Sequence, residues 1–94
     1  MLFRSNKGLV PYIKRHGEDL VGLEIGTCRA ESTYYFLDKC PNILKLYTID
    51  PYKGYQDWNG EITQETVDRF RDIAIKNLEP YGDRVRMKIG RAHV

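Results

Sequence analysis

The sequence has few cysteines, no long apolar run and no large excess of one charge. Its two cysteines, Cys28 and Cys40, are too few for a disulfide framework and fit no metal motif, which predicts free thiols in a cytoplasmic protein. No apolar stretch approaches the ~20 residues that cross a bilayer, and residues 1–7 lack the apolar core of a signal peptide. The sequence therefore indicates neither a secreted nor a membrane-spanning protein.

The charged residues do not indicate a strongly charged partner. The 94 residues include 15 Lys and Arg against 13 Asp and Glu, a net charge of +2. The basic residues are scattered, and the stripe Arg84, Arg86, Lys88 and Arg91 is best interpreted as a solvated edge, so no nucleic-acid partner is predicted. The two histidines have no acidic or cysteine partner at ligand spacing, so no metal site is predicted.

The apolar pattern predicts one alternating α/β domain. The expected helices and strands, in chain order, cover 5–15 (helix), 20–25 (strand), 29–39 (helix), 46–49 (strand), 63–79 (helix) and 84–89 (strand). The nearly unbroken apolar run at 20–25 is typical of a parallel strand covered on both faces, whereas the alternation at 84–89 favours an edge strand. Right-handed crossovers then give a parallel sheet with strand order 3-2-1, a truncated half of a Rossmann-like doubly wound fold.

Two features at the ends of the first two strands indicate a ligand. Gly26 allows a tight turn into a helix whose free N–H groups attract an anion or a carboxylate. Asp50 ends the next strand, where an acidic residue often binds ribose hydroxyls. The alternative is an Asp-Pro turn in which the carboxylate binds its own backbone. Together the two features favour a nucleoside-type ligand.

The residue two positions after Gly26 distinguishes a dinucleotide site from a site for a ligand without phosphates. A dinucleotide fingerprint needs a second glycine there so that the backbone can approach a pyrophosphate, and this chain has Cys28. A cysteine side chain crowds a pyrophosphate but leaves room for a ligand without phosphates. NAD is therefore expected to bind poorly.

These residues resemble a known family. Glu24-Ile25-Gly26-Thr27 through Ala30 and Ser32, followed by Ile49-Asp50-Pro51-Tyr52, look like the first two motifs of class I S-adenosylmethionine-dependent methyltransferases. The likeness is to the small-molecule O-methyltransferase branch, and it covers the chain from about Leu20 onward. Ala30 departs from the glycine that is usual at its position, and the departure adds one methyl group.

The resemblance implies a site for S-adenosyl-L-methionine at the ends of the first two strands. Its implied residues are Glu24, Gly26, Thr27, Cys28, Ser32, Asp50, Pro51, Tyr52, Arg91 and Ala92. In that comparison Glu24 and Gly26 line the methionine end, with Thr27 and Cys28 beside them in the turn. Ser32 binds the carboxylate and Asp50 binds the ribose. Pro51 and Tyr52 pack on the adenine ring, and residues 90–92 run past its edge.

The resemblance also implies that much of a methyltransferase is not in these 94 residues. The strands that would carry acceptor-binding residues are missing, so we expect a single incomplete domain, 1–94, that is inactive alone and has no catalytic residue of its own. Its partners would be a small-molecule methyl acceptor and either a second copy or the missing half, paired through the free edge of 20–25. Apolar surface should remain exposed, unless the helix at 5–15 covers that edge. The alternatives are a non-catalytic α/β module for a nucleotide or a protein, and a fragment of a nucleotide-sugar or dinucleotide enzyme.

Overall fold

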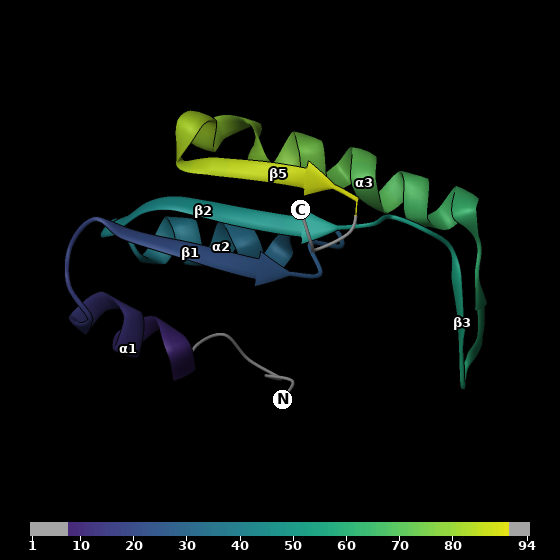
Figure 1. The fold of residues 1–94 in the computed structure, drawn as a ribbon, viewed down its shortest axis with the longest axis horizontal. Coiled ribbons are helices and arrows are strands. Elements are labelled where there is room, and N and C mark those ends of the chain that lie inside the picture. Colours follow the sequence, from purple (N-terminus) through teal and green to yellow (C-terminus); the bar gives the residue numbers. More distant parts are fainter. Residues whose placement is uncertain (1–7, 91–94) are drawn as a thin grey trace.

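The computed structural model describes residues 8–90 and has a mixed α/β architecture (Figure 1). Its helices and strands are α1 (Leu9–Arg15), β1 (Leu20–Ile25), α2 (Glu31–Lys39), β2 (Ile43–Asp50), β3 (Tyr55–Asp57), β4 (Gly60–Ile62), α3 (Gln64–Leu78), a 3₁₀ segment (Glu79–Arg84) and β5 (Val85–Ile89). The predicted bounds of β1 are confirmed, and β2 is longer at both ends than the predicted strand.

Three strands form a parallel sheet in the order β1-β2-β5. Leu23 pairs with Tyr47 across β1 and β2, and Thr48 pairs with Met87 across β2 and β5. The predicted mixed α/β class and the three-stranded parallel sheet are therefore confirmed, and β5 is an edge strand as its alternation predicted. Because the strands are parallel, the carboxyl ends of β1 and β2 lie at the same end of the sheet, where Gly26 and Asp50 meet.

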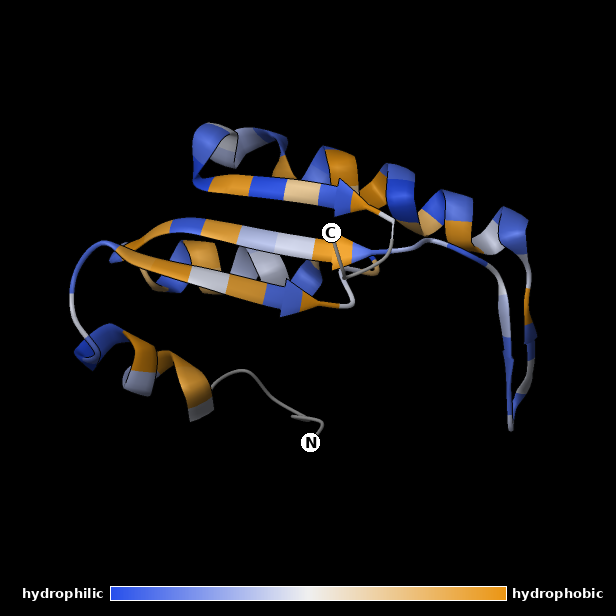
Figure 2. Ribbon diagram, in the orientation of Figure 1, coloured by the Kyte–Doolittle hydropathy of each residue, from blue (hydrophilic) through white to orange (hydrophobic). Residues whose placement is uncertain are grey.

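The core lies between the sheet and the helices α2 and α3, which Figure 1 shows behind the strands. Its buried members come from both layers: Ala30, Leu37, Cys40, Ile43, Leu46, Tyr52, Val67, Ala74 and Leu78. Figure 2 shows the apolar residues of α3 along one side of the helix. Thr63 begins α3 as the sequence predicts, since its hydroxyl accepts the N–H of Thr66 at 3.2 Å.

The prediction that β1 is covered on both faces is wrong. Its residues alternate in exposure: Leu20, Gly22 and Glu24 are half-buried, with Glu24 bonded to Thr33 of α2, and the other three are exposed. Val21, Leu23 and Ile25 are 65%, 62% and 71% exposed. An apolar run identifies a strand, but it does not establish that a second layer covers it. The expectation of exposed apolar surface is confirmed for the described residues.

The loop predicted after β2 contains a second, two-stranded sheet. Strands β3 and β4 form an antiparallel hairpin in which Asp57 pairs with Gly60, and Figure 1 shows the hairpin projecting from the rest of the fold. Trp58 at its tip is 91% exposed. None of the helices in residues 8–90 has the length and apolarity needed to cross a membrane.

Candidate functional site

The turn after β1 is set by Gly26. Its backbone has a φ of +94°, which favours glycine, and its N–H donates to the carbonyl of Ile49 at 2.8 Å. A Cβ built on Gly26 would have no other atom within 4 Å. The conformation, and not a lack of room, therefore selects glycine, and the space above this turn is open to a ligand.

Left-handed backbone conformations gather around this turn. Cys28, Ala30 and Tyr52 have φ values of +51°, +66° and +49°, and Asp19 is the one other non-glycine residue with positive φ among those described. The value at Ala30 gives a physical reason why glycine is usual at this position in the resembled family. Such conformations cost about 1–2 kcal/mol each for residues with a Cβ, and they tend to occur at functional sites.

Asp50 holds the two strand ends together. Its Oδ2 accepts the backbone N–H of Cys28 at 3.0 Å, and its Oδ1 accepts the N–H of Tyr52 at 2.9 Å. The second bond is the local turn that the sequence offered as the alternative role for this residue, whereas the first reaches the turn after β1. A carboxylate has about four lone-pair sites, so two bonds leave capacity for a hydroxyl pair on a ligand.

Tyr52 is part of the core at this end of the sheet. It is 4% exposed, and its hydroxyl donates to the carbonyl of Cys28 at 2.6 Å. Burial raises the pKa of the Tyr52 phenol, and the nearby Asp50 carboxylate raises it further, so the phenol stays protonated at neutral pH. The ring thus braces the turn, and the phenol is unsuited to act as a base.

The Glu24 carboxylate accepts hydrogen bonds from a network of buried hydroxyl groups. Its Oε1 accepts the hydroxyls of Thr33 on α2 and Thr48 on β2, the latter at 2.8 Å. Thr48 gives its one proton to Glu24, so the 2.7 Å contact between Thr27 and Thr48 has the Thr27 hydroxyl as donor. The network fixes the carboxylate at the end of β1.

Thr33 and Thr48 are functional candidates that sequence reasoning missed. Both are fully buried, and both stand at positions where the helix and strand patterns place an apolar residue. Polar residues at such positions need a buried partner, and a search for polar side chains on the apolar stripes would have found them.

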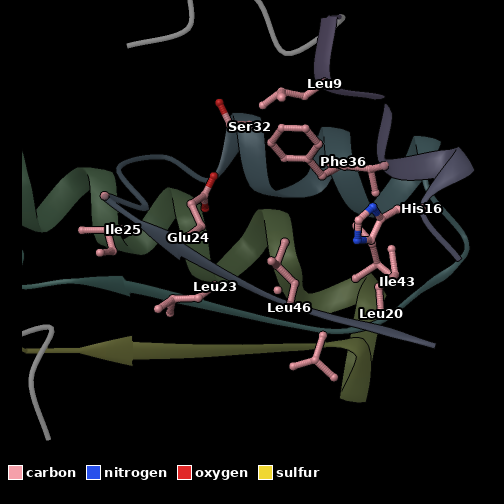
Figure 3. A pocket seen from close by; sticks show the side chains of 14 residues that line it. Leu9, His16, Leu20, Leu23, Glu24, Ile25, Ser32, Phe36, Ile43 and Leu46 are labelled. Atoms are coloured by element: carbon pink, nitrogen blue, oxygen red, sulfur yellow. The ribbon is translucent and has the colours of Figure 1, made fainter. Parts of the chain in front are cut away.

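A cavity of about 570 Å³ lies along the free edge of β1, between α1 and α2 (Figure 3). One end is polar, with Glu24, Gly26 and Ser32, and Figure 3 shows the Glu24 carboxyl group pointing toward Ser32. The rest of the lining is mainly apolar and includes Leu9, Phe36 and Leu46. The volume is within the usual range of ligand sites.

A second hollow of about 250 Å³ lies beside Asp50 and Cys28, with Pro51 and Tyr52 also in its lining. Gly26 lines both hollows, so they adjoin at the turn after β1. The arrangement offers one carboxylate on each side of an open glycine. It suits an elongated ligand with a cationic group at one end and hydroxyls at the other.

The remaining predicted residues are placed as follows. Thr27 is buried in the hydroxyl network, and Ser32 is exposed in the first turn of α2. Arg91 and Ala92 lie outside the described residues, although the preceding Gly90 donates its N–H to the Asp50 carbonyl at 3.0 Å. Within residues 8–90, no three His, Cys, Asp or Glu side chains come close enough together to hold a metal ion.

Comparisons of the chain with family models, curated proteins and solved structures give no match. The candidate site is therefore defined by the geometry of the strand ends and by the sequence motifs.

Proposed function

We propose that the chain binds S-adenosyl-L-methionine across the ends of β1 and β2. The observation that carries the proposal is the pair of adjoining hollows at Gly26, with the Glu24 carboxylate beside one and the Asp50 carboxylate beside the other. Glu24 suits the ammonium group of the methionine part, and the exposed N-terminal turn of α2 with Ser32 suits its carboxylate. Asp50 suits the ribose hydroxyls.

The same two carboxylates argue against a ligand rich in phosphate. They would repel a pyrophosphate placed at Gly26, and the Cys28 side chain stands where a dinucleotide-binding turn has its second glycine. A nucleoside ligand that carries a positive charge matches the site in both shape and sign. This comparison favours S-adenosylmethionine over NAD and over a nucleotide sugar.

On this proposal the chain is the cofactor-binding half of a Rossmann-like, doubly wound methyltransferase fold. Bound S-adenosylmethionine supplies an activated methyl group for transfer to a small-molecule acceptor. Glu24 and Asp50 position the two ends of the cofactor, and the Gly26 turn leaves room between them. Acceptor binding needs residues beyond these, so the 94-residue chain by itself should not transfer the methyl group.

Asp50→Ala tests the proposal, with S-adenosylhomocysteine as the ligand in a calorimetric titration. Losing a hydrogen-bond partner of this charged kind costs ~1.5–3 kcal/mol, so the affinity should fall about tenfold to a hundredfold. Asp72→Ala is a matched control, because that carboxylate is exposed on α3 and lines neither hollow. Thermal unfolding of both variants separates lost binding from lost folding. Equal affinity for the wild type and a folded Asp50→Ala protein would refute the role of Asp50.

A non-catalytic module that binds another protein is the second candidate. One observation favours it: the face of the sheet that carries Val21, Leu23 and Ile25 is uncovered. The two functions share a border, because Val21, Leu23 and Ile25 also line the cavity beside Glu24 and Ser32.

A further inference from the structure

The hollow beside Asp50 has an apolar wall to which the resemblance assigns no role. Its lining includes Tyr55 at the start of β3, together with Val67 and Phe70 of α3. Its volume of about 250 Å³ is below the ~300–1,000 Å³ of complete ligand sites, so it suits one part of a ligand. That part would contact both a carboxylate and an aromatic wall.

Tyr52 and Tyr55 both line this hollow, but they differ in the surface that they offer to a ligand. Tyr52 is 4% exposed, belongs to the core and donates its hydroxyl proton to the carbonyl of Cys28. Tyr55 is 55% exposed. A flat apolar group that packs on Tyr55 removes aromatic surface from water, which is favourable. Of the two rings, that of Tyr55 is therefore the better wall for a ligand.

The segment that carries Tyr55 is held in place by Gln64, the first residue of α3. The Gln64 side chain accepts the N–H of Gly54 at 3.0 Å and donates to the carbonyl of Tyr52 at 2.8 Å. A Cβ on Gly54 would lie 2.9 Å from the carbonyl oxygen of Ile62, so a side chain there would collide with the backbone. Tyr55 pairs with Ile62, which packs against the core. The start of β3 is thus fixed beside the hollow before a ligand arrives.

The contacts that place Tyr55 all lie within residues 52–70. They join the end of β2, the hairpin and the N-terminal half of α3. None of them involves the free edge of β1 or the uncovered face of the sheet. The aromatic wall therefore does not depend on what packs against that edge or that face.

The two kinds of group in the hollow indicate which part of a ligand it takes. Asp50 accepts hydrogen bonds from hydroxyls, and Tyr55 offers a flat ring. A nucleoside carries both complements close together, because its base is attached to the ribose that bears the hydroxyls. Stacking on an aromatic side chain needs only the π-face of the base. A wall of this kind distinguishes ligands with a base from ligands without one.

We propose that Tyr55 is a specificity-determining residue of the Asp50 hollow, where its ring packs against the base of a nucleoside ligand. Asp50 holds the ribose, and Tyr55 favours ligands that carry a base over ligands that end at the ribose. This inference rests on the proposed function, because it takes the hollow as the nucleoside end of the site.

Two ligands that differ in the base test the role of Tyr55. S-adenosylhomocysteine carries the base, whereas S-ribosylhomocysteine lacks it and keeps the ribose and the amino acid. In a calorimetric titration, Tyr55→Ala should weaken the binding of S-adenosylhomocysteine about fivefold to a hundredfold, the effect of losing one base–aromatic stack. The affinity for S-ribosylhomocysteine should not change. Tyr55→Phe keeps the ring and should bind both ligands as the wild type does.

Trp58→Ala is a matched control, because Trp58 belongs to the same hairpin, is 91% exposed and lines neither hollow. It should leave both affinities unchanged. A measurement on the unsubstituted chain adds a test that needs no variant to fold. A nuclear Overhauser effect should connect the ring protons of Tyr55 to the base protons of bound S-adenosylhomocysteine, and its absence would overturn the role of Tyr55.

Asp50→Ala separates this inference from the proposed function. It should weaken both ligands, because both carry the ribose. If S-adenosylhomocysteine does not bind the wild type, or if Asp50→Ala leaves both affinities unchanged, the proposed function fails and the role of Tyr55 fails with it. The role of Tyr55 alone is overturned if Asp50→Ala weakens both ligands while Tyr55→Ala weakens neither or both equally. It is also overturned if Trp58→Ala weakens S-adenosylhomocysteine as much as Tyr55→Ala does.

Discussion

Thr48→Val removes the middle hydroxyl of the buried network and nearly preserves the shape of the side chain. The Thr27 hydroxyl then loses its acceptor, and Glu24 keeps only the bond from Thr33. A hydrogen bond to a charged group contributes ~1.5–3 kcal/mol and a neutral one ~0.5–1.5, while the added buried methyl returns ~0.8. We expect a net loss of about 1–4 kcal/mol in the free energy of unfolding.

Urea denaturation followed by circular dichroism measures this loss, provided that the slope m is unchanged. A domain of this size has a total stability of only ~5–14 kcal/mol, so the expected shift in midpoint is large. Leu78→Ala, in the core but in the lining of neither hollow, is a control for simple packing loss. It should reduce stability without weakening the binding of S-adenosylhomocysteine, whereas Thr48→Val should weaken both.

The combination of variants decides whether the hydroxyls act through Glu24. In the double variant Thr33→Val/Thr48→Val, the changes in stability should be non-additive, because both hydroxyls bind the same carboxylate oxygen. A Thr48→Val protein that unfolds within 0.5 kcal/mol of the wild type, on the order of a neutral surface change, would refute the reasoning.

Three further outcomes are expected. NAD at equal concentration should not displace S-adenosylhomocysteine, and displacement in a competition titration would reverse the ranking of the two ligands. Tyr52→Phe should lower the free energy of unfolding by ~0.5–1.5 kcal/mol through loss of the bond to Cys28, and the absorbance of Tyr52 should show no ionisation until well above pH 10, the usual pKa of tyrosine. The free edge of β1 should make the chain dimerise or aggregate in light scattering. A stable monomer at tens of micromolar would show that the edge is covered.

Most of the fold was predictable because its signals are local. The apolar run of β1 and the apolar stripe of α3 identify their elements without knowledge of what packs on them. The hairpin of β3 and β4 was missed because its strands are short, exposed and without alternation. The dipeptide Asn59-Gly60 between Tyr55 and Ile62 is a hairpin signal that predicts it.

The candidate site was less predictable because its contacts link distant segments. The sequence predicts Gly26 and Asp50 as site residues, because each stands at the end of a predicted strand. Thr33 and Thr48 could have been found as polar residues on apolar stripes, but their shared partner Glu24 depends on how α2 lies over the sheet. Tyr52 has a positive φ, is buried and bonds to the distant Cys28, and no local pattern of residues predicts these features.

The contacts around the turn after β1 explain how the strained backbone is maintained. Cys28 and Ala30 together store about 2–4 kcal/mol in left-handed conformations. Three bonds from outside the turn oppose this strain: Asp50 accepts from Cys28, Tyr52 donates to the carbonyl of Cys28, and Asn77 of α3 donates to the carbonyl of Arg29 at 2.8 Å. At ~0.5–1.5 kcal/mol for a neutral bond and ~1.5–3 for the charged one, they are of the same size as the strain. The turn is therefore formed before a ligand arrives, so that binding needs little further ordering of the backbone.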